Sequence, residues 1–156
     1  MYLGIDLGTS NSAIVGNDGG QLRLFKTVDG YDVLPSAIMI DRRGAVFVGK
    51  KAYDQEALSP EDVGKRFKRL MGTTSAVTFK KANRTMSAEE ASSEVLKALV
   101  AQARMAAGDF EIDGAIVTIT GHDFAVNDQA FMFECRPTSP CQATVGAVAA
   151  TNGSGS

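Results

Sequence analysis

Residues 2–16 read Y-L-G-I-D-L-G-T-S-N-S-A-I-V-G, and this stretch decides the fold. Its two apolar runs, 2–7 and 12–16, are predicted to form short strands around a tight turn. Gly8 stands in that turn, where the absence of a Cβ lets backbone N–H groups approach a ligand closely. The stretch therefore predicts a hairpin whose turn can contact a bound anion.

Polar side chains surround Gly8 in this turn. Thr9, Ser10 and Ser12 carry hydroxyls and Asn11 carries an amide, and all four can donate hydrogen bonds to phosphate oxygens. Asp6 would repel a bare phosphate, but its carboxylate suits a hydrated Mg²⁺ bound between it and the phosphate. The pattern thus favours a metal–nucleotide over a free anion, although a polar hairpin that binds nothing has the same spacing. Neither the Walker A pattern nor the G-x-G-x-x-G fingerprint is present.

Composition narrows the class of protein. The 156 residues, 44% of them hydrophobic, predict one domain with a substantial core. The net charge of −2 gives the whole chain no electrostatic footprint for nucleic acid, and no apolar run is long enough to span a bilayer. No signal-peptide pattern is present, Cys135 and Cys141 form no C-x-x-C pair, and His122 alone is too little for a zinc site. We expect a reduced, cytoplasmic protein that binds neither nucleic acid nor membrane.

Further strands are expected in the first third of the chain. The turn at residues 17–20, Asn-Asp-Gly-Gly, is a strong hairpin signal, so 22–28 is predicted to be the third strand of an antiparallel meander. Residues 36–40 and 45–49 are predicted to form a second hairpin.

Two helices are expected to follow. The first spans 50–58 and ends before Pro60. The second spans 60–71, with Ser59 as its cap, Pro60 at its first position and Gly72 at its end.

The clearest helix is 88–107. Ser87 and Glu90 form a capping box, apolar residues keep one face, and Gly108 supplies the C-terminal cap. The β-branched run 115–119 after it is predicted to be a buried strand that joins the first sheet in parallel.

The regular pattern ends at Thr120. Residues 120–156 show neither helical nor strand periodicity and are predicted to form a divergent tail that is poorly packed or disordered.

Several segments, in order, resemble the heat-shock-70 chaperones of the DnaK type, within the actin-like ATPase superfamily. G-I-D-L-G-T-S-N-S-A-I-V resembles the first phosphate-binding motif of that family. The further matches are D-G-Y-D-V-L-P-S-A-I-M-I (29–40), V-F-V-G-K-K-A (46–52), K-R-F-K-R-L-M-G (65–72), S-A-E-E-A-S-S-E-V-L-K-A-L (87–99) and I-D-G-A-I-V-T-I (112–119). The resemblance implies an α/β fold, a ribonuclease H-like or actin-like ATPase half-lobe over residues 2–119, with a mixed sheet of an antiparallel meander plus a parallel strand.

The resemblance also implies roles for single residues. Asp6 would lie near Mg²⁺ through water, while Gly8, Thr9, Ser10 and Asn11 would hold the β- and γ-phosphates of ATP or ADP. Thr9 would also contact the γ-phosphate or the attacking water.

Lys68 matches the catalytic lysine of the family, which stabilises charge on the transferring phosphoryl group. Without the resemblance it reads as one more surface lysine. The implied partners are the nucleotide and, in a full-length form, unfolded clients and co-chaperones of a stress-response system.

The chain departs from the family pattern at Thr120, where the family has a proline, and the second phosphate motif and the adenosine motif do not follow. We therefore expect weak ATP binding, hydrolysis near background, and apolar surface exposed where the other half of the cleft would pack. Three hypotheses follow: a DnaK-type ATPase truncated or frameshifted near residue 120, a non-enzymatic interaction module on the same half-lobe, or an actin-like filament protein. The Lys68 segment argues against the third, and whether the chain is an enzyme stays open.

Overall fold

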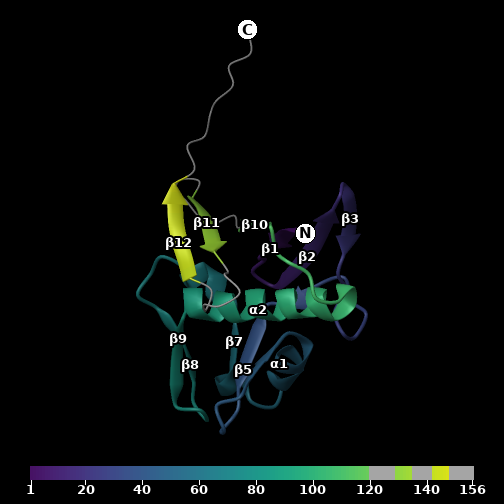
Figure 1. Ribbon diagram of the computed structural model, residues 1–156. Coiled ribbons are helices and arrows are strands. Elements are labelled where there is room, and N and C mark those ends of the chain that lie inside the picture. Colours follow the sequence, from purple (N-terminus) through teal and green to yellow (C-terminus); the bar gives the residue numbers. More distant parts are fainter. Residues whose placement is uncertain (120–128, 135–141, 148–156) are drawn as a thin grey trace.

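The computed structural model describes residues 1–119, 129–134 and 142–147 (Figure 1). Cys135, Cys141 and His122 lie outside these residues. In chain order the elements, with η marking 3₁₀ helices, are β1 (Tyr2–Asp6), β2 (Asn11–Asp18), β3 (Gln21–Leu24), β4 (Leu34–Pro35), β5 (Ala37–Ile40), β6 (Val46–Val48), α1 (Lys50–Gln55), η1 (Pro60–Asp62), β7 (Val63–Lys65), η2 (Phe67–Leu70), β8 (Ala76–Phe79), β9 (Arg84–Ser87), α2 (Ala88–Ala107), β10 (Gly114–Thr118), β11 (Gln129–Glu134) and β12 (Gln142–Ala147).

The long helix α2 lies between two groups of strands. In Figure 1 it runs across the middle of the molecule, with β1, β2, β3 and β10 above it and β5, β7 and α1 below it. One apolar cluster joins these layers, because buried residues of β1, β2, β5 and α2 all belong to it. Among the described residues, no helix is long and apolar enough to cross a membrane.

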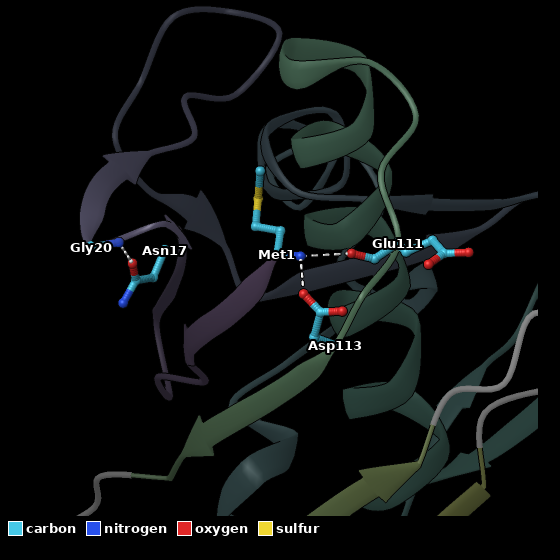
Figure 2. Close-up of polar contacts among 5 residues, drawn as sticks. All are labelled: Met1, Asn17, Gly20, Glu111 and Asp113. Carbon is cyan, nitrogen blue, oxygen red and sulfur yellow. Dashed lines mark hydrogen bonds and ion pairs between the residues drawn. The ribbon is translucent and has the colours of Figure 1, made fainter.

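The main sheet confirms the predicted topology. Its order is β10-β1-β2-β3, with β1, β2 and β3 antiparallel and β10 parallel to β1. Gly19 and Gly20 both have positive φ, as the predicted tight hairpin turn requires. The Gly20 N–H donates to Asn17 Oδ1 at 3.0 Å, which closes this turn (Figure 2). The third strand is shorter than predicted, because β3 ends at Leu24.

Helix α2 has the predicted bounds and caps. The Glu90 N–H donates to Ser87 Oγ at 3.1 Å, and the Ser87 N–H donates to Glu90 Oε2 at 2.8 Å. Gly108 ends the helix with a φ of 80°, a conformation that favours glycine. The buried face of α2 packs under the main sheet and so fixes the position of β2 above it.

The predicted helix over 60–71 is wrong. Its middle forms strand β7, which pairs with β5 in the register Ile38 to Gly64, and only the short helices η1 and η2 flank it. Gly64 is a poor helix former, and the strand pairing supplies backbone hydrogen bonds that a helix would otherwise make. A Cβ on Gly64 would lie 2.6 Å from Val77 Cγ1, so β8 packs directly on this strand. The hairpin of β8 and β9 was not predicted from the sequence.

Strand β10 is not buried as predicted. Cross-strand register puts Ile116, Gly4, Val15 and Leu24 in one row across the main sheet, on the face away from α2. Ile116 is 73% exposed and Tyr2, on the same face, is 62% exposed. This face of the sheet therefore presents apolar side chains to solvent, while the expected apolar surface where the other half of the cleft would pack stays a prediction.

The start of β10 is tied to the start of β1. The Met1 amino group donates to the Glu111 carbonyl oxygen at 2.9 Å and forms an ion pair with the Asp113 carboxylate (Figure 2). These contacts join residues more than a hundred positions apart and help to align the parallel pair.

Two strands occur where the sequence predicted no regular structure. β11 and β12 pair in the antiparallel direction, with Gln129 opposite Ala147 and Glu134 opposite Gln142. The other residues of 120–156 lie outside the described residues.

Candidate functional site

The turn between β1 and β2 depends on Gly8. A Cβ at this position would lie 2.0 Å from the Asn11 carbonyl oxygen, so only glycine allows the chain to fold back so tightly. The Gly8 N–H donates to Ser12 Oγ at 3.2 Å. Because this N–H is used inside the turn, Gly8 can serve a ligand mainly by allowing a close approach of the backbone.

A pair of buried hydroxyls holds the turn from below. Ser12 Oγ and Ser36 Oγ lie 2.8 Å apart, and the Ser36 hydroxyl donates to the Gly8 carbonyl oxygen at 2.9 Å. The Ser36 N–H donates to the Ser10 carbonyl oxygen at 2.8 Å. Ser12 was expected to donate to phosphate, but its side chain is buried and bonded here, so its role is structural.

The other polar side chains at the turn are open to solvent, at least in part. Ser10 and Asn11 are exposed, Thr9 is half-buried, and Asp6 is exposed at the end of β1. The Thr118 hydroxyl, at the end of β10, lies 3.3 Å from Asp6 Oδ1 and donates to it. The ends of two parallel strands therefore bring a carboxylate, a hydroxyl and the turn to one edge of the sheet.

Lys68 reaches this turn from a distant part of the chain. It lies on η2, is 2% exposed, and donates from Nζ to the Leu7 carbonyl oxygen at 2.9 Å. Burial lowers the pKa of Lys68 below its usual range, and the negative charge of Asp6 partly opposes that shift. The alternative interpretation, an ordinary surface lysine, is wrong.

The local backbone explains how Lys68 is delivered. Arg66, which precedes η2, adopts a left-handed conformation with φ 55°, and this turns the chain from β7 into η2. Phe67 and Met71 are buried beside Lys68 and anchor η2 in the core. Hydrophobic packing therefore offsets the cost of burying the ammonium.

A cavity of about 550 Å³ adjoins the turn. The turn supplies Thr9, Ser10 and Asn11 to its wall, and four cationic residues also line it, namely Lys50, Lys51, Lys65 and Arg66. Lys50 is paired with Asp54 and Lys65 with Glu56, so part of this charge is neutralised within the protein. These cations could not be assigned to the site from the sequence, because α1 and β7 meet the turn only in three dimensions.

The donor set at the turn fits a magnesium–phosphate group. Four kinds of group occur together at one edge of the sheet: an exposed carboxylate, hydroxyl and amide donors, a backbone cradle that a Cβ would fill, and a nearby ammonium. Mg²⁺ favours one or two carboxylates with waters and phosphate oxygens, and phosphate needs several donors. Each of the residues predicted from the sequence, Asp6, Gly8 to Asn11 and Lys68, thus lies in or beside this turn.

Two comparisons with known proteins agree on one family. The Hsp70 protein family model matches residues 2–124. A chaperone protein dnaK from Phaeodactylum tricornutum is 28% identical, over an alignment that covers 77% of this chain and 23% of that protein. The chain thus spans about a quarter of the length of that relative. The mixed sheet and its helices form the ribonuclease H-like, actin-like ATPase half-lobe that the resemblance implied. Since the family model covers most of its residues, the chain belongs to the Hsp70 family.

Proposed function

We propose that residues 2–119 act as the first lobe of the nucleotide-binding domain of an ATP-binding chaperone of the DnaK type. The turn between β1 and β2 would hold the phosphates of ATP or ADP. The observation that supports this most is the position of Lys68, whose Nζ lies 2.9 Å from the Leu7 carbonyl oxygen, across 61 positions of sequence. A solvated turn that binds nothing has no need of a buried ammonium against its backbone.

The roles of the residues follow from their chemistry. Ser10 and Asn11 are exposed and would donate hydrogen bonds to the β- and γ-phosphate oxygens, and Thr9 would contact the γ-phosphate or the attacking water. Asp6 would hold Mg²⁺ through water, and the metal, when bound, supplies charge neutralisation between the phosphates. Lys68 would stabilise the negative charge of the transferring phosphoryl group.

We propose further that this lobe by itself binds nucleotide weakly and hydrolyses it near background. Its cavity is bordered by exposed lysines and exposed turn residues, and ion pairs in contact with water contribute little. In the superfamily the nucleotide lies in a cleft between two lobes, which excludes water.

We also propose that the protein acts as a chaperone on unfolded clients, cooperates with co-chaperones, has a role in a stress response and is cytoplasmic. The chain spans 23% of the dnaK relative, so these proposals concern a larger protein than the described lobe.

Two other functions use the same half-lobe. An interaction module without nucleotide could use the exposed face of the main sheet, on which Tyr2 and Ile116 lie. An actin-like filament protein is not favoured, because Lys68 matches the chaperone pattern and the family model is Hsp70.

A nuclear magnetic resonance titration with Mg-ATP and with Mn-ATP tests the proposal. Manganese broadens the amide signals of nearby residues, so the wild-type chain should lose signals at 6–12 while those at 41–44 stay sharp. Asp6→Ala should remove this selective broadening, because the carboxylate that orients the metal is gone.

Asp18→Ala is the matched control, since it removes an exposed carboxylate from the turn between β2 and β3. This variant should behave as the wild type does. Selective broadening that persists in Asp6→Ala would show that the site assignment is wrong. No selective broadening in the wild type would favour the interaction module.

A further inference from the structure

Arg66 stands apart from the other cations of the cavity beside the turn of Gly8. It lines this cavity together with Thr9, Ser10 and Asn11 of the turn. Its side chain is exposed, and no hydrogen bond, ion pair or ring contact joins its guanidinium group to another residue of 1–119, 129–134 or 142–147. The structure around it therefore does not account for its charge.

The lysines that line the same cavity have partners within the protein. These partners are the Asp54 carboxylate for Lys50, the Glu56 carboxylate for Lys65 and the Phe47 ring for Lys51. Asp29 is the other carboxylate of the lining, and no ion pair within the described residues joins it to Arg66. Of these four cations, Arg66 is thus the one whose donors are not already committed.

The backbone of Arg66 explains why its side chain lies at the cavity. Its φ of 55° and ψ of 19° are left-handed, a conformation that residues with a Cβ rarely adopt. If β7 continued as a strand, Arg66 would lie on the same side as Gly64, which packs on Val77 and Phe79. The left-handed turn instead leaves Arg66 exposed and lining the cavity beside Lys65. Strained backbone of this kind gathers at functional sites.

Strand pairing fixes where Arg66 stands relative to the turn of Gly8. The last pair between β5 and β7 is Ala37 with Lys65, so Arg66 comes directly after this pair on one strand and Ser36 directly before it on the other. The Ser36 N–H donates to the Ser10 carbonyl oxygen at 2.8 Å. The same segment therefore connects Arg66 to the turn.

We propose that Arg66 is a second cationic contact of the phosphate site and binds the terminal phosphate groups of the nucleotide, an inference that rests on the proposed function. Thr9, Ser10 and Asn11, which would hold the β- and γ-phosphates, line the cavity with it. Lys68 is buried against the Leu7 carbonyl oxygen, whereas Arg66 is exposed and able to move onto a bound phosphate. A guanidinium group donates two parallel hydrogen bonds to phosphate oxygens.

A nuclear magnetic resonance titration of the whole chain with Mg-ATP and with Mg-tripolyphosphate tests this inference, with the amide signals of residues 8–11 as the readout. Arg66→Gln should raise the Kd for both probes about fivefold or more, because charge-assisted hydrogen bonds are lost. Arg66→Lys keeps the charge without the planar donors, and its Kd should be intermediate. Arg69→Gln removes the same charge from an exposed position of η2 that does not line the cavity, and its Kd should stay within about twofold of the wild type.

A glycine at this position separates binding from folding. Arg66→Gly suits the left-handed backbone, so its urea midpoint should be higher than that of Arg66→Ala, while both variants lose affinity as Arg66→Gln does. Asn83→Gly is the matched backbone control, since Asn83 has a φ of 47° in an exposed turn that does not line the cavity. Its Kd for both probes should be that of the wild type.

Three results would count against the inference. Wild-type affinity in Arg66→Gln and Arg66→Gly, when the wild type itself binds both probes, would overturn the role of Arg66 alone. Equal weakening in Arg69→Gln would show attraction by overall charge and would overturn it as well. The absence of any saturable change at 8–11 in the wild type would overturn the proposed function, and this inference with it.

Discussion

The hydroxyl oxygens of Ser12 and Ser36 lie 2.8 Å apart, with both side chains buried. Together they bond both backbone groups of Gly8, since Ser12 Oγ accepts from its N–H and Ser36 Oγ donates to its carbonyl oxygen. Strand β4 holds Ser36 in place, because Pro35 pairs with Asn11 of β2. The Pro-Ser segment thus supports the turn that we propose binds phosphate.

Removing one hydroxyl of this pair tests the support. Ser36→Ala leaves the partly buried Gly8 carbonyl oxygen without its side-chain donor, and we expect the free energy of unfolding to fall by about 1–3 kcal/mol. Urea denaturation measures this change. Ser93→Ala is the control, because its hydroxyl donates to the Glu90 carbonyl oxygen within α2, and it should change stability by less than about 0.5 kcal/mol. Equal effects of the two substitutions would contradict a special role for Ser36.

A methyl group at Gly8 tests the tight turn itself. Since its Cβ would lie 2.0 Å from the Asn11 carbonyl oxygen, Gly8→Ala must move the turn, at a cost of about 1–3 kcal/mol in stability. The Mn-ATP broadening at 6–12 should disappear in the same variant. Gly114→Ala serves for comparison, because its Cβ would lie 3.2 Å from the ring of the exposed Tyr2, which can move away. If Gly8→Ala kept both stability and broadening, the turn would not be the site.

The ion pair of Asp62 and Lys81 predicts a response to acid. Burial acts to raise the pKa of Asp62, but the hydrogen bonds and charge of Lys81, together with the charge of Arg42, outweigh it and lower the pKa below the ordinary value of 3.8. A carboxyl with a lowered folded-state pKa stabilises the protein above the unfolded value, and that stability is lost as pH falls through the folded value. The free energy of unfolding of the wild type should therefore approach that of Asp62→Asn as the pH falls.

The urea concentration at the midpoint of unfolding, measured for both proteins at about pH 7 and about pH 3, tests this expectation. The gap between wild type and Asp62→Asn should be largest near neutral pH and shrink at the lower pH. The exposed substitution Asp18→Asn should follow the wild type at both values. A gap that stays constant would mean that Asp62 and Lys81 do not interact as the structure shows.

Local signals in the sequence were sufficient for several elements. Helix α2 was predicted to the residue, because Ser87, Glu90 and Gly108 mark its ends and its apolar face has the helical period. The turn of Gly19 and Gly20 was likewise predicted, because glycine tolerates the positive φ that both positions need.

Elements that depend on distant partners were predicted poorly. The segment 60–71 has helical end signals, yet β5 supplies a pairing edge that makes its centre a strand. The hairpin of β8 and β9 had one usable signal that was missed, since Asn83 adopts a left-handed conformation with φ 47° in its turn. Strand β10 was expected to be buried because it is apolar, but burial depends on what covers a face, and sequence alone does not specify that.

The residues of the candidate site divide in the same way. Asp6 and the Gly8 turn could be proposed from their chemistry and spacing, because strand, glycine and hydroxyls are contiguous in the sequence. Lys68 was assigned only through the resemblance to the family, and Ser36 was not recognised as the support of the turn.

Local sequence was enough to predict the first hairpin and the long capped helix and to propose a phosphate site at the turn of Gly8, because hydrophobic period, caps and glycine act over a few residues. Only the tertiary structure decided that Lys68 contacts Leu7 and that Ser36 contacts Gly8. Those contacts join residues 61 and 28 positions apart. They form because burying the apolar residues of η2, β4 and α2 in one core brings these polar groups together, and no local pattern encodes that distance.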